Sequence, residues 1–353
     1  MLTSLKLMIR PSHVSYCFVI VLCNLCLAFT LSASEVSNKS LQVHGFLAQG
    51  VIDASGSNYI NDDENLSFEL TEVGINASYQ LNDTFRIAGQ AVYLNGGNRY
   101  HEGPRVDYLL LEWDAFHNDV WQASFYFGRV KNNHWLHSST RDIPFARPSI
   151  IIPQVVYFDG FRDIAVGGDG AAVKLSYSDD AIGEIDFNFS RGESSISEEQ
   201  ADVVIGKLAL GTIDHDLDAQ ASMYWRPPYS QWRFGISALD SSFTYDRVEI
   251  DNFFDGDFIF QFYTANAIYE GEFWQFSAEV FQERFVTSGF YFPGFHRDEI
   301  GQGYYVQASY QLQKDFSLMT RYERFYANKD DRNGAKLSQS TGGLVPSYFG
   351  FHH

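Results

Sequence analysis

The chain has 353 residues, and 25 Lys and Arg against 44 Asp and Glu give it a formal net charge of −19. Nucleic-acid phosphates would repel so acidic a chain, which excludes nucleic acid as a partner. The 28 glycines and the 16% share of aromatic residues also disfavour a helix bundle, because these residues prefer turns and strands.

Residues 1–34 are typical of a secretory signal peptide. Lys6 and Arg10 precede an apolar run from Val14 to Leu31, and small residues follow at 32–34. A transmembrane anchor is the alternative, but no Lys or Arg cluster follows to stop transfer. Cleavage would remove two basic residues and all three cysteines, which leaves a mature chain of charge −21. We therefore expect no disulfides, no metal site and no cofactor in the mature protein.

From about residue 40 onward, apolar and polar residues alternate with period 2. Clear runs are 121–127, 217–225, 274–280 and 304–312. Together with the residues that flank these runs, we expect strands of about 9 to 14 residues, whereas soluble strands usually have about 5 to 6. Strands that cross a bilayer need about 9 to 11 residues. The pattern predicts an all-β fold, a transmembrane antiparallel up-and-down β-barrel, with a soluble all-β domain as the alternative.

Each run has an apolar face, which we expect to contact lipid, and a polar face, which we expect to line the lumen. The apolar face begins and ends in aromatic residues, as at Phe85 and Tyr93 or Trp121 and Phe127, which is typical of two membrane interfaces. The polar face carries Gln, Ser, Asn, Gly and isolated charges. The charges that we predict to face the lumen are Arg86, Lys174, Glu184, Asp186, Arg233, Glu279, Arg321 and Glu323.

Short and long connections alternate along the chain, as expected when strands cross a membrane up and down. We count about thirteen strands from Leu41 to Ala327, which puts all the long loops on the outer side of the membrane. The long loops fall near residues 54–66, 97–105, 130–169, 190–214, 244–257, 285–302 and 327–345.

An odd number of strands is unusual, because bacterial single-chain barrels have even numbers. Residues 348–353 read as the start of a further strand. We expect a truncated product that lacks about three strands of a 16-strand barrel, with an open seam or a poorly paired closure. A miscounted strand, or Phe351 serving as the terminal aromatic residue, is the alternative.

Three segments resemble a family of Gram-negative outer-membrane porins that is distantly similar to phosphate-selective porins. They are LQVHGFLAQG at 41–50, the strand pair at 67–90, and GRVKNNHWLHSSTRDIPFARPSIIIPQVVYFD at 128–159, whose TRD-PF-RPS motif is the most specific part. The resemblance implies a trimer of 16-strand barrels, in contact with outer-membrane lipid and lipopolysaccharide, through which small hydrophilic solutes diffuse passively. Anion selectivity is not implied, because the arginine ladder and lysine cluster of phosphate-selective porins are absent.

In such porins the third long loop folds into the barrel, which here is the loop 130–169. Its motif residues Arg141, Asp142 and Arg147 are the best candidates for the pore constriction. The full predicted constriction set is Arg129, Lys131, Arg141, Asp142, Arg147 and Arg162. Basic residues at a constriction would attract anions. Alternatively, Asp142, Asp159 and Asp163 pair with the arginines and hold the loop against the wall. We also expect the apolar residues Phe145 and 150–152 to pack, so that the loop is ordered.

Two other functions remain open. Acidic residues in the long loops, such as 62–64 and 198–199, could bridge lipopolysaccharide through divalent cations or serve an adhesin or receptor, although no spacing matches a calcium loop. A barrel hydrolase of the phospholipase or protease type would need a histidine that activates a nucleophile. The only neighbouring candidates are His134, His137, Ser138 and Ser139. No catalytic motif is visible, so we predict no enzymatic activity.

Overall fold

The computed structural model describes residues 41–53, 66–100, 102–159, 162–196, 200–201, 205, 208–314 and 316–340. These residues form one antiparallel sheet of thirteen strands, in which each strand pairs with its neighbours in sequence. The structure thus confirms the predicted up-and-down β fold. The predicted signal peptide at 1–34 and the C-terminal residues 341–353 lie outside the described residues.

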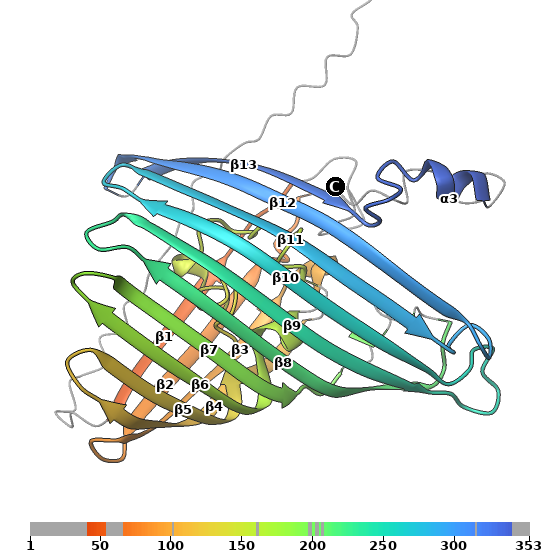
Figure 1. The fold of residues 1–353 in the computed structure, drawn as a ribbon, viewed down its shortest axis with the longest axis horizontal. Coiled ribbons are helices and arrows are strands. Elements are labelled where there is room, and N and C mark those ends of the chain that lie inside the picture. Colours follow the sequence, from red (N-terminus) through yellow and green to blue (C-terminus); the bar gives the residue numbers. More distant parts are fainter. Residues whose placement is uncertain are drawn as a thin grey trace, which may run out of the picture.

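The strands curl around a common interior, and the orange strands β1–β3 lie behind the green and blue strands in Figure 1. Their bounds are β1 Leu41–Gln49, β2 Thr71–Gln80, β3 Phe85–Asn95, β4 Gly103–His117, β5 Trp121–Lys131, β6 Gly167–Asp179, β7 Gly183–Glu193, β8 Thr212–Arg226, β9 Trp232–Asp246, β10 Gly256–Glu270, β11 Trp274–Ser288, β12 His296–Gln313 and β13 Phe316–Tyr326. Within the described residues, β1 and β13 end the strand order and do not pair with each other.

Four short helical turns complete the described structure: η1 Gly97–Arg99, η2 Pro144–Ala146, α1 Arg162–Val166 and α3 Ala335–Ser340. In this part of the chain, no helix has both the length and the apolar character needed to cross a membrane.

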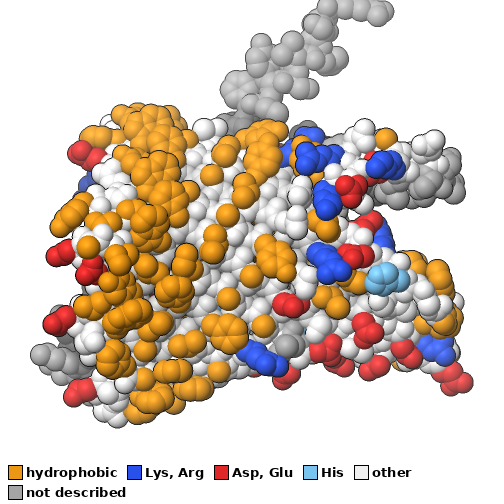
Figure 2. All heavy atoms as spheres, in the orientation of Figure 1, with side chains coloured by type: hydrophobic (Ala, Val, Ile, Leu, Met, Phe, Trp, Pro, Cys, Tyr) orange, Lys and Arg blue, Asp and Glu red, His pale blue; other side chains and the backbone are white. Residues whose placement is uncertain are grey.

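The outer face of the sheet carries an apolar band, which is orange in Figure 2. At its short-turn end, aromatic rings follow one another across β8 to β12, with centroids 4.6–6.1 Å apart. This row comprises Trp225, Trp232, Phe234, Tyr269, Trp274, Phe276 and Tyr310. Aromatic rings concentrate where hydrocarbon meets head groups, so this row marks one edge of the membrane-spanning zone.

Strands β8–β12 continue well beyond that zone, since they have 15 to 18 residues and about 9 to 11 suffice to cross. In their loop-side halves the polarity of the two faces is exchanged. On β10, Phe258 and Phe262 point inward and are buried, whereas Asp257 points outward. Inward-facing residues at this end of the sheet form a hydrophobic core of Ile213, Phe243, Tyr245, Phe258 and Phe290.

The long loops on this side are therefore shorter than predicted. The connections are 247–255 and 289–295, not 244–257 and 285–302. The sequence prediction failed here because a strand that leaves the membrane keeps its period of 2 but buries its apolar side inside.

Candidate functional site

The third long connection, residues 132–166 between β5 and β6, lies inside the barrel, where Figure 1 shows it between the two walls. At its base, the Asn132 amide N–H donates to the Val166 carbonyl at 2.9 Å, and the Asn132 side chain donates to Gln220 of β8 at 3.0 Å. We call residues 132–166 the inner loop, and the side of the sheet that it contacts the inner face.

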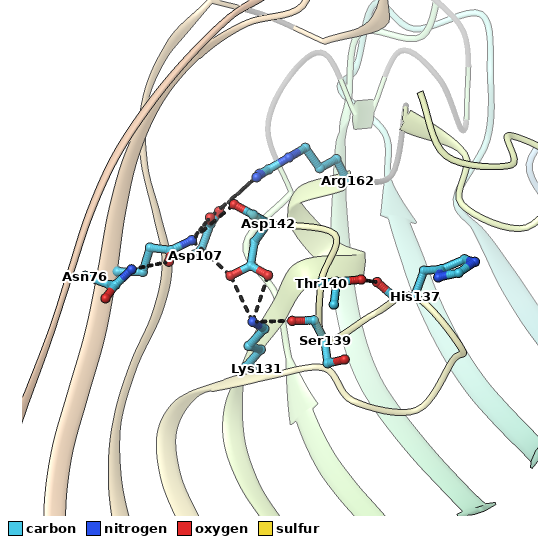
Figure 3. Close-up of polar contacts among 9 residues, drawn as sticks. Asn76, Asp107, Lys131, His137, Ser139, Thr140, Asp142 and Arg162 are labelled. Atoms are coloured by element: carbon cyan, nitrogen blue, oxygen red, sulfur yellow. Dashed lines mark hydrogen bonds and ion pairs between the residues drawn. The ribbon is translucent and has the colours of Figure 1, made fainter. Parts of the chain in front are cut away.

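On one wall, the inner loop is held by a buried polar network around Gln90 of β3 (Figure 3). The Gln90 side-chain amide donates to Asp142 of the loop at 2.9 Å and to Asp107 of β4 at 3.0 Å. Lys131 Nζ lies 2.7 Å from Asp142, and Arg162 Nη1 lies 3.1 Å from Asp107. This network joins both ends of the loop to β3 and β4.

A β-bulge explains how Asp107 reaches this network. Gln90 pairs with Tyr108, but the next residue, Ala91, pairs with Val106, so Asp107 has no partner in the ladder. A bulge re-aims the side chain of the extra residue. Asp107 thereby faces Arg162 inside the barrel.

Two more arginines of the inner loop also meet carboxylates. Arg147 Nη2 lies 2.6 Å from Glu72 of β2, and Arg141 Nη2 lies 3.6 Å from Asp159 within the loop. Arg141 also donates to the Tyr157 carbonyl at 3.3 Å. Burial lowers the pKa of Arg141, and the carboxylate of Asp159 counteracts this shift. Of the carboxylates expected to pair with the loop arginines, Asp159 meets Arg141, whereas Asp142 pairs with Lys131 and the side chain of Asp163 lies outside the described residues. Glu72 and Asp107 of the wall compensate the other two arginines.

Arg129 is the exception in the predicted constriction set, because it lies on the outer face. It is two residues from Phe127, which is 44% exposed on that face, and its ladder partner Leu109 is exposed as well. Its guanidinium lies 3.5 Å from Asp169. Its Nε also donates to the Val106 carbonyl of β4 at 2.9 Å. These contacts hold the Arg129 side chain against β4 and β6 and not in the inner-loop network, which corrects its assignment to the constriction.

The inner loop also contacts the opposite wall. The Tyr157 hydroxyl donates to Glu279 of β11 at 3.0 Å and accepts the His137 backbone N–H at 2.8 Å. Burial raises the pKa of Tyr157 well above its ordinary value, so it stays a donor. Around this contact, loop residues pack against wall residues in one core of Trp135, Ile152, Val156, Tyr157, Leu239, Phe262, Phe281 and Tyr305.

Strand β13 forms a third set of contacts with the loop. Arg321 donates to the Ser149 hydroxyl at 3.1 Å and to the Ile151 carbonyl at 3.0 Å, and Glu323 accepts the Val155 backbone N–H at 3.2 Å. Since Arg147 pairs with β2, the short stretch 147–151 bridges β2 and β13, which lie near opposite ends of the strand order.

The apolar residues of the loop divide into two groups. Ile152 is buried in the core described above. Phe145 and Ile150 are 78% and 53% exposed, so the expectation that they pack is wrong. Polar contacts with the wall on either side of these residues hold the loop backbone in place, so the side chains of Phe145 and Ile150 need not be buried.

Two buried histidines lie in the same loop. His134 Nε2 lies 2.8 Å from the Ser190 hydroxyl of β7, and the His137 ring stacks on Tyr305 with centroids 6.3 Å apart. Burial lowers the pKa of each to about 4, helped at His137 by the positive charges of Arg233 and Arg321. Both imidazoles are therefore neutral at pH 7.

The residues considered for hydrolysis do not assemble a catalytic group. The Ser138 hydroxyl accepts the Trp135 backbone N–H at 3.1 Å. His134 does meet a serine, Ser190, but its Nδ1 is buried without a hydrogen-bond partner among the described residues, so no carboxylate orients the ring. The described residues also contain no cluster of three or more His, Cys, Asp or Glu that could hold a metal ion.

Asp251 is an acidic residue of the long loops that serves local structure. Asp251 accepts backbone N–H groups of Leu210, Gly211 and Phe253, each at 3.1 Å. The acidic stretches at 62–64 and 198–199 lie outside the described residues.

The eight charges predicted for the lumen lie on the inner face, and most have a partner of opposite charge. Arg86 pairs with Glu112, and Lys174 lies 3.3 Å from Asp186. Arg321 pairs with Glu323 at 2.8 Å, whereas Glu279 is fully buried under Tyr157. Arg233 lies 5.2 Å from the Tyr224 ring centroid, and Glu184 lies 3.8 Å from Arg226.

These charges differ in their access to water. Arg86, Lys174 and Asp186, nearer the short turns, have side chains that are 40–44% exposed. Glu279 and Arg321 are covered by the inner loop. The short-turn half of the inner face is thus wet and charged, and the loop fills the middle.

Several residues of the site were missed from sequence. Glu72 and Glu112 lie on the polar phase of their strands, so the alternation could have found them. The bulge puts Asp107 on the opposite face from the one that alternation predicts, and Gln90 is uncharged, so neither residue could be recognised from the sequence. The residues missed are Tyr157 of the inner loop and, on the inner face, Glu72, Gln90, Asp107, Glu112, Arg226 and Glu270.

The wall and the inner loop together define a transmembrane up-and-down β-barrel with one connection folded inside. No protein-family model matches the sequence, and no curated protein sequence matches it. Solved structures of similar fold include an anion-selective porin from Comamonas acidovorans (13% identity, 83% of this chain and 80% of that chain, TM-score 0.48). The outer membrane channel DcaP of Acinetobacter baumannii is also similar (12% identity, 86% and 83%, TM-score 0.48), as is OmpF of Salmonella typhi (13%, 80% and 89%, TM-score 0.38).

Proposed function

We propose that this protein is an outer-membrane porin, a passive diffusion channel for small hydrophilic solutes. The observation that supports it best is the contrast between the two faces of the sheet. The outer face carries an apolar band with an aromatic edge, while the short-turn half of the inner face carries water-accessible charges such as Arg86, Lys174 and Asp186. An apolar outside and a wet, charged inside are what an aqueous pore through lipid requires.

In this proposal the inner loop forms the constriction. Its residues Arg141, Asp142, Arg147 and Arg162, together with Lys131 at the end of β5, determine the width of the pore by holding the loop in place. Each of the four basic residues has a carboxylate within 3.6 Å, and the field of a close ion pair falls off faster with distance than that of a lone charge. We therefore expect weak ion selectivity, and not the strong preference for anions that the basic residues alone would give.

The proposal also covers the export, the orientation and the oligomeric state of the channel. The predicted signal peptide at 1–34 would direct export, the long loops would face outward, and the barrel would function as a homotrimer among outer-membrane lipids and lipopolysaccharide. Chemical crosslinking in mild detergent tests the trimer, and loss of residues 1–34 from the exported chain tests the cleavage.

Liposome swelling tests the transport function. Vesicles that contain the refolded protein should swell in solutions of small neutral sugars, at a rate that falls as the sugar becomes larger. A variant with the Glu279→Gln change, which alters the wall contact of Tyr157, should change this size dependence. The matched change Glu193→Gln, at an exposed position at the end of β7, should not. Vesicles that swell no faster than empty ones would refute the proposal.

A further inference from the structure

One acidic side chain of the inner face, Glu283 of β11, has no partner of opposite charge. It lies on the same face as Glu279, four residues earlier, because β11 alternates without a bulge. Glu72, Asp107 and Glu279 each meet a partner from the inner loop. Glu283 is half-buried, and among the described residues it forms no hydrogen bond or ion pair.

Phenyl rings surround this carboxylate. Phe262 of β10 is the direct ladder partner of Glu283, and Phe281 and Phe285 flank it on β11. The ring centroid of Phe281 lies 5.0 Å from that of Phe262 and 5.8 Å from that of Phe325 on β13. Ladder partners have Cβ atoms about 4.5 to 5.5 Å apart, so the ring of Phe262 borders the Glu283 side chain.

Two glycines of β12 determine where the carboxylate lies. Gly301 is the other ladder partner of Glu283, and Gly303 is the partner of Phe281. A Cβ atom on Gly301 would lie 2.7 Å from Glu283 Oε1, and one on Gly303 would come equally close to the Phe281 ring. The carboxylate therefore lies against the backbone of Gly301, a close approach that a larger residue would prevent.

The carboxylate lies where two apolar cores meet. Phe262 and Phe281 belong to the core that contains the inner loop, and Phe285 packs against the core at the loop-side end of the sheet. The next residue, Arg284, has an outward side chain that is 43% exposed, so this level of β11 lies beyond the membrane-spanning zone. Burial without a neighbouring charge raises the pKa of Glu283 to about 7. An isolated carboxylate among apolar groups is costly, which makes it a candidate for ligand binding.

We propose that Glu283 and the rings of Phe262 and Phe281 bind the ammonium group of a small organic cation. An ammonium group can donate charge-assisted hydrogen bonds to the carboxylate and lie over the face of a phenyl ring. A divalent metal ion fits less well, because Mg²⁺ and Ca²⁺ need about six or more oxygen ligands. The described residues contain no group of three or more His, Cys, Asp or Glu that could supply them.

The position of the site relates it to transport. Glu283 lies on the loop side of Glu279, which contacts the inner loop. A solute that enters from the long loops would thus reach the site before the constriction. This part of the proposal rests on the proposed function.

The test uses n-butylammonium as the charged probe and n-butanol as the uncharged probe with the same alkyl chain. Binding to the refolded, detergent-solubilised protein is measured by ligand-observed NMR, with protein-free micelles as the blank. Glu283→Gln removes the charge and keeps the shape of the side chain. The control Asp257→Asn removes the same charge from an exposed position on the outer face of β10. Heat-modifiable migration on gels verifies that each variant is folded.

We expect the unchanged protein to bind n-butylammonium at least about tenfold more tightly than n-butanol. Glu283→Gln should abolish this preference, and Asp257→Asn should retain binding of the cation within about twofold. Phe262→Leu, which stays apolar but loses the ring, should weaken binding of the cation by about threefold and leave n-butanol unaffected.

Equal binding of n-butylammonium by the unchanged protein and by Glu283→Gln would overturn the proposal. Displacement of n-butylammonium by millimolar Mg²⁺ would overturn the assignment to an organic cation, and an unchanged affinity in Phe262→Leu would overturn the role of that ring. Because binding is measured in detergent, a failure of channel activity leaves these results unchanged, so the two proposals fail separately.

Discussion

The contact between Asp107 and Arg162 is the most direct point at which to loosen the inner loop. The two side chains are 2% and 6% exposed. The change Asp107→Asn removes the carboxylate and leaves the guanidinium of Arg162 buried without its counter-charge. Breaking a buried ion pair in this way costs about 3 to 5 kcal/mol. The asparagine carbonyl can still accept one hydrogen bond, so we use the lower value of about 3 kcal/mol, which corresponds to a shift of roughly 100-fold in the opening equilibrium of the loop.

A single cysteine reports this opening. All native cysteines lie at or before residue 26, so Ser138→Cys places a thiol at a buried loop position where the signal-cleaved protein has no other. Maleimide labelling should be roughly 100-fold faster when Asp107→Asn is added.

The matched control is Asp298→Asn, which breaks the exposed pair with Arg284, whose side chains are 43% and 37% exposed. Exposed pairs contribute about 1 kcal/mol or less, so labelling should change less than about fivefold. Unchanged labelling in Asp107→Asn, or an equal acceleration in both variants, would refute the reasoning.

Three further predictions concern the same loop. Burial lowers the pKa of His134 and His137 to about 4, so the open loop binds more protons than the closed one below about pH 6.5. The closed state should thus lose up to about 3 kcal/mol per histidine as the pH falls from 6.5 to 4. Hydrogen exchange of the loop amides, corrected for intrinsic rates, should become faster over this range. An exchange rate that does not depend on pH would contradict this. Tyr157→Phe removes one of the donors to the buried Glu279 carboxylate, so Ser138→Cys labelling should rise by about tenfold. No rise would show that this contact does not hold the loop. Glu72→Gln uncovers the charge of Arg147, and reversal potentials should move toward anions; a shift toward cations would contradict the proposed charge compensation.

The sequence predicted the strands well where lipid sets the pattern. A lipid-facing strand must be apolar on every second residue, so runs such as 121–127 and 274–280 could be recognised without any structure. The lumen phase followed from the same alternation, and it put Arg86 and Lys174 on the inner face where the structure has them.

The sequence failed where another environment replaces lipid. Beyond the membrane, Phe243 and Phe258 point inward and pack in a core, so the apolar side of the strand changes from the outer to the inner face. Arg129 looked like part of the loop motif, but it is still a strand residue, and its side chain contacts Val106 and Asp169 of the neighbouring strands instead of the inner loop.

Partners that are far apart in sequence were also beyond prediction. Arg147 pairs with Glu72, 75 residues earlier, and Tyr157 with Glu279, 122 residues later. The path of the loop across the barrel decides these pairs. Local spacing carries no information about it, so the sequence could suggest that the arginines are compensated without identifying which carboxylates compensate them.

Single-channel recording in planar bilayers tests the central claim most directly. The refolded protein should give discrete, salt-dependent conductance steps, with reversal potentials close to zero in a salt gradient because the loop charges are paired. The Asp107→Asn variant should give larger or noisier steps, and the Asp298→Asn variant should resemble the unchanged protein. Membranes that stay silent with folded protein would contradict the account.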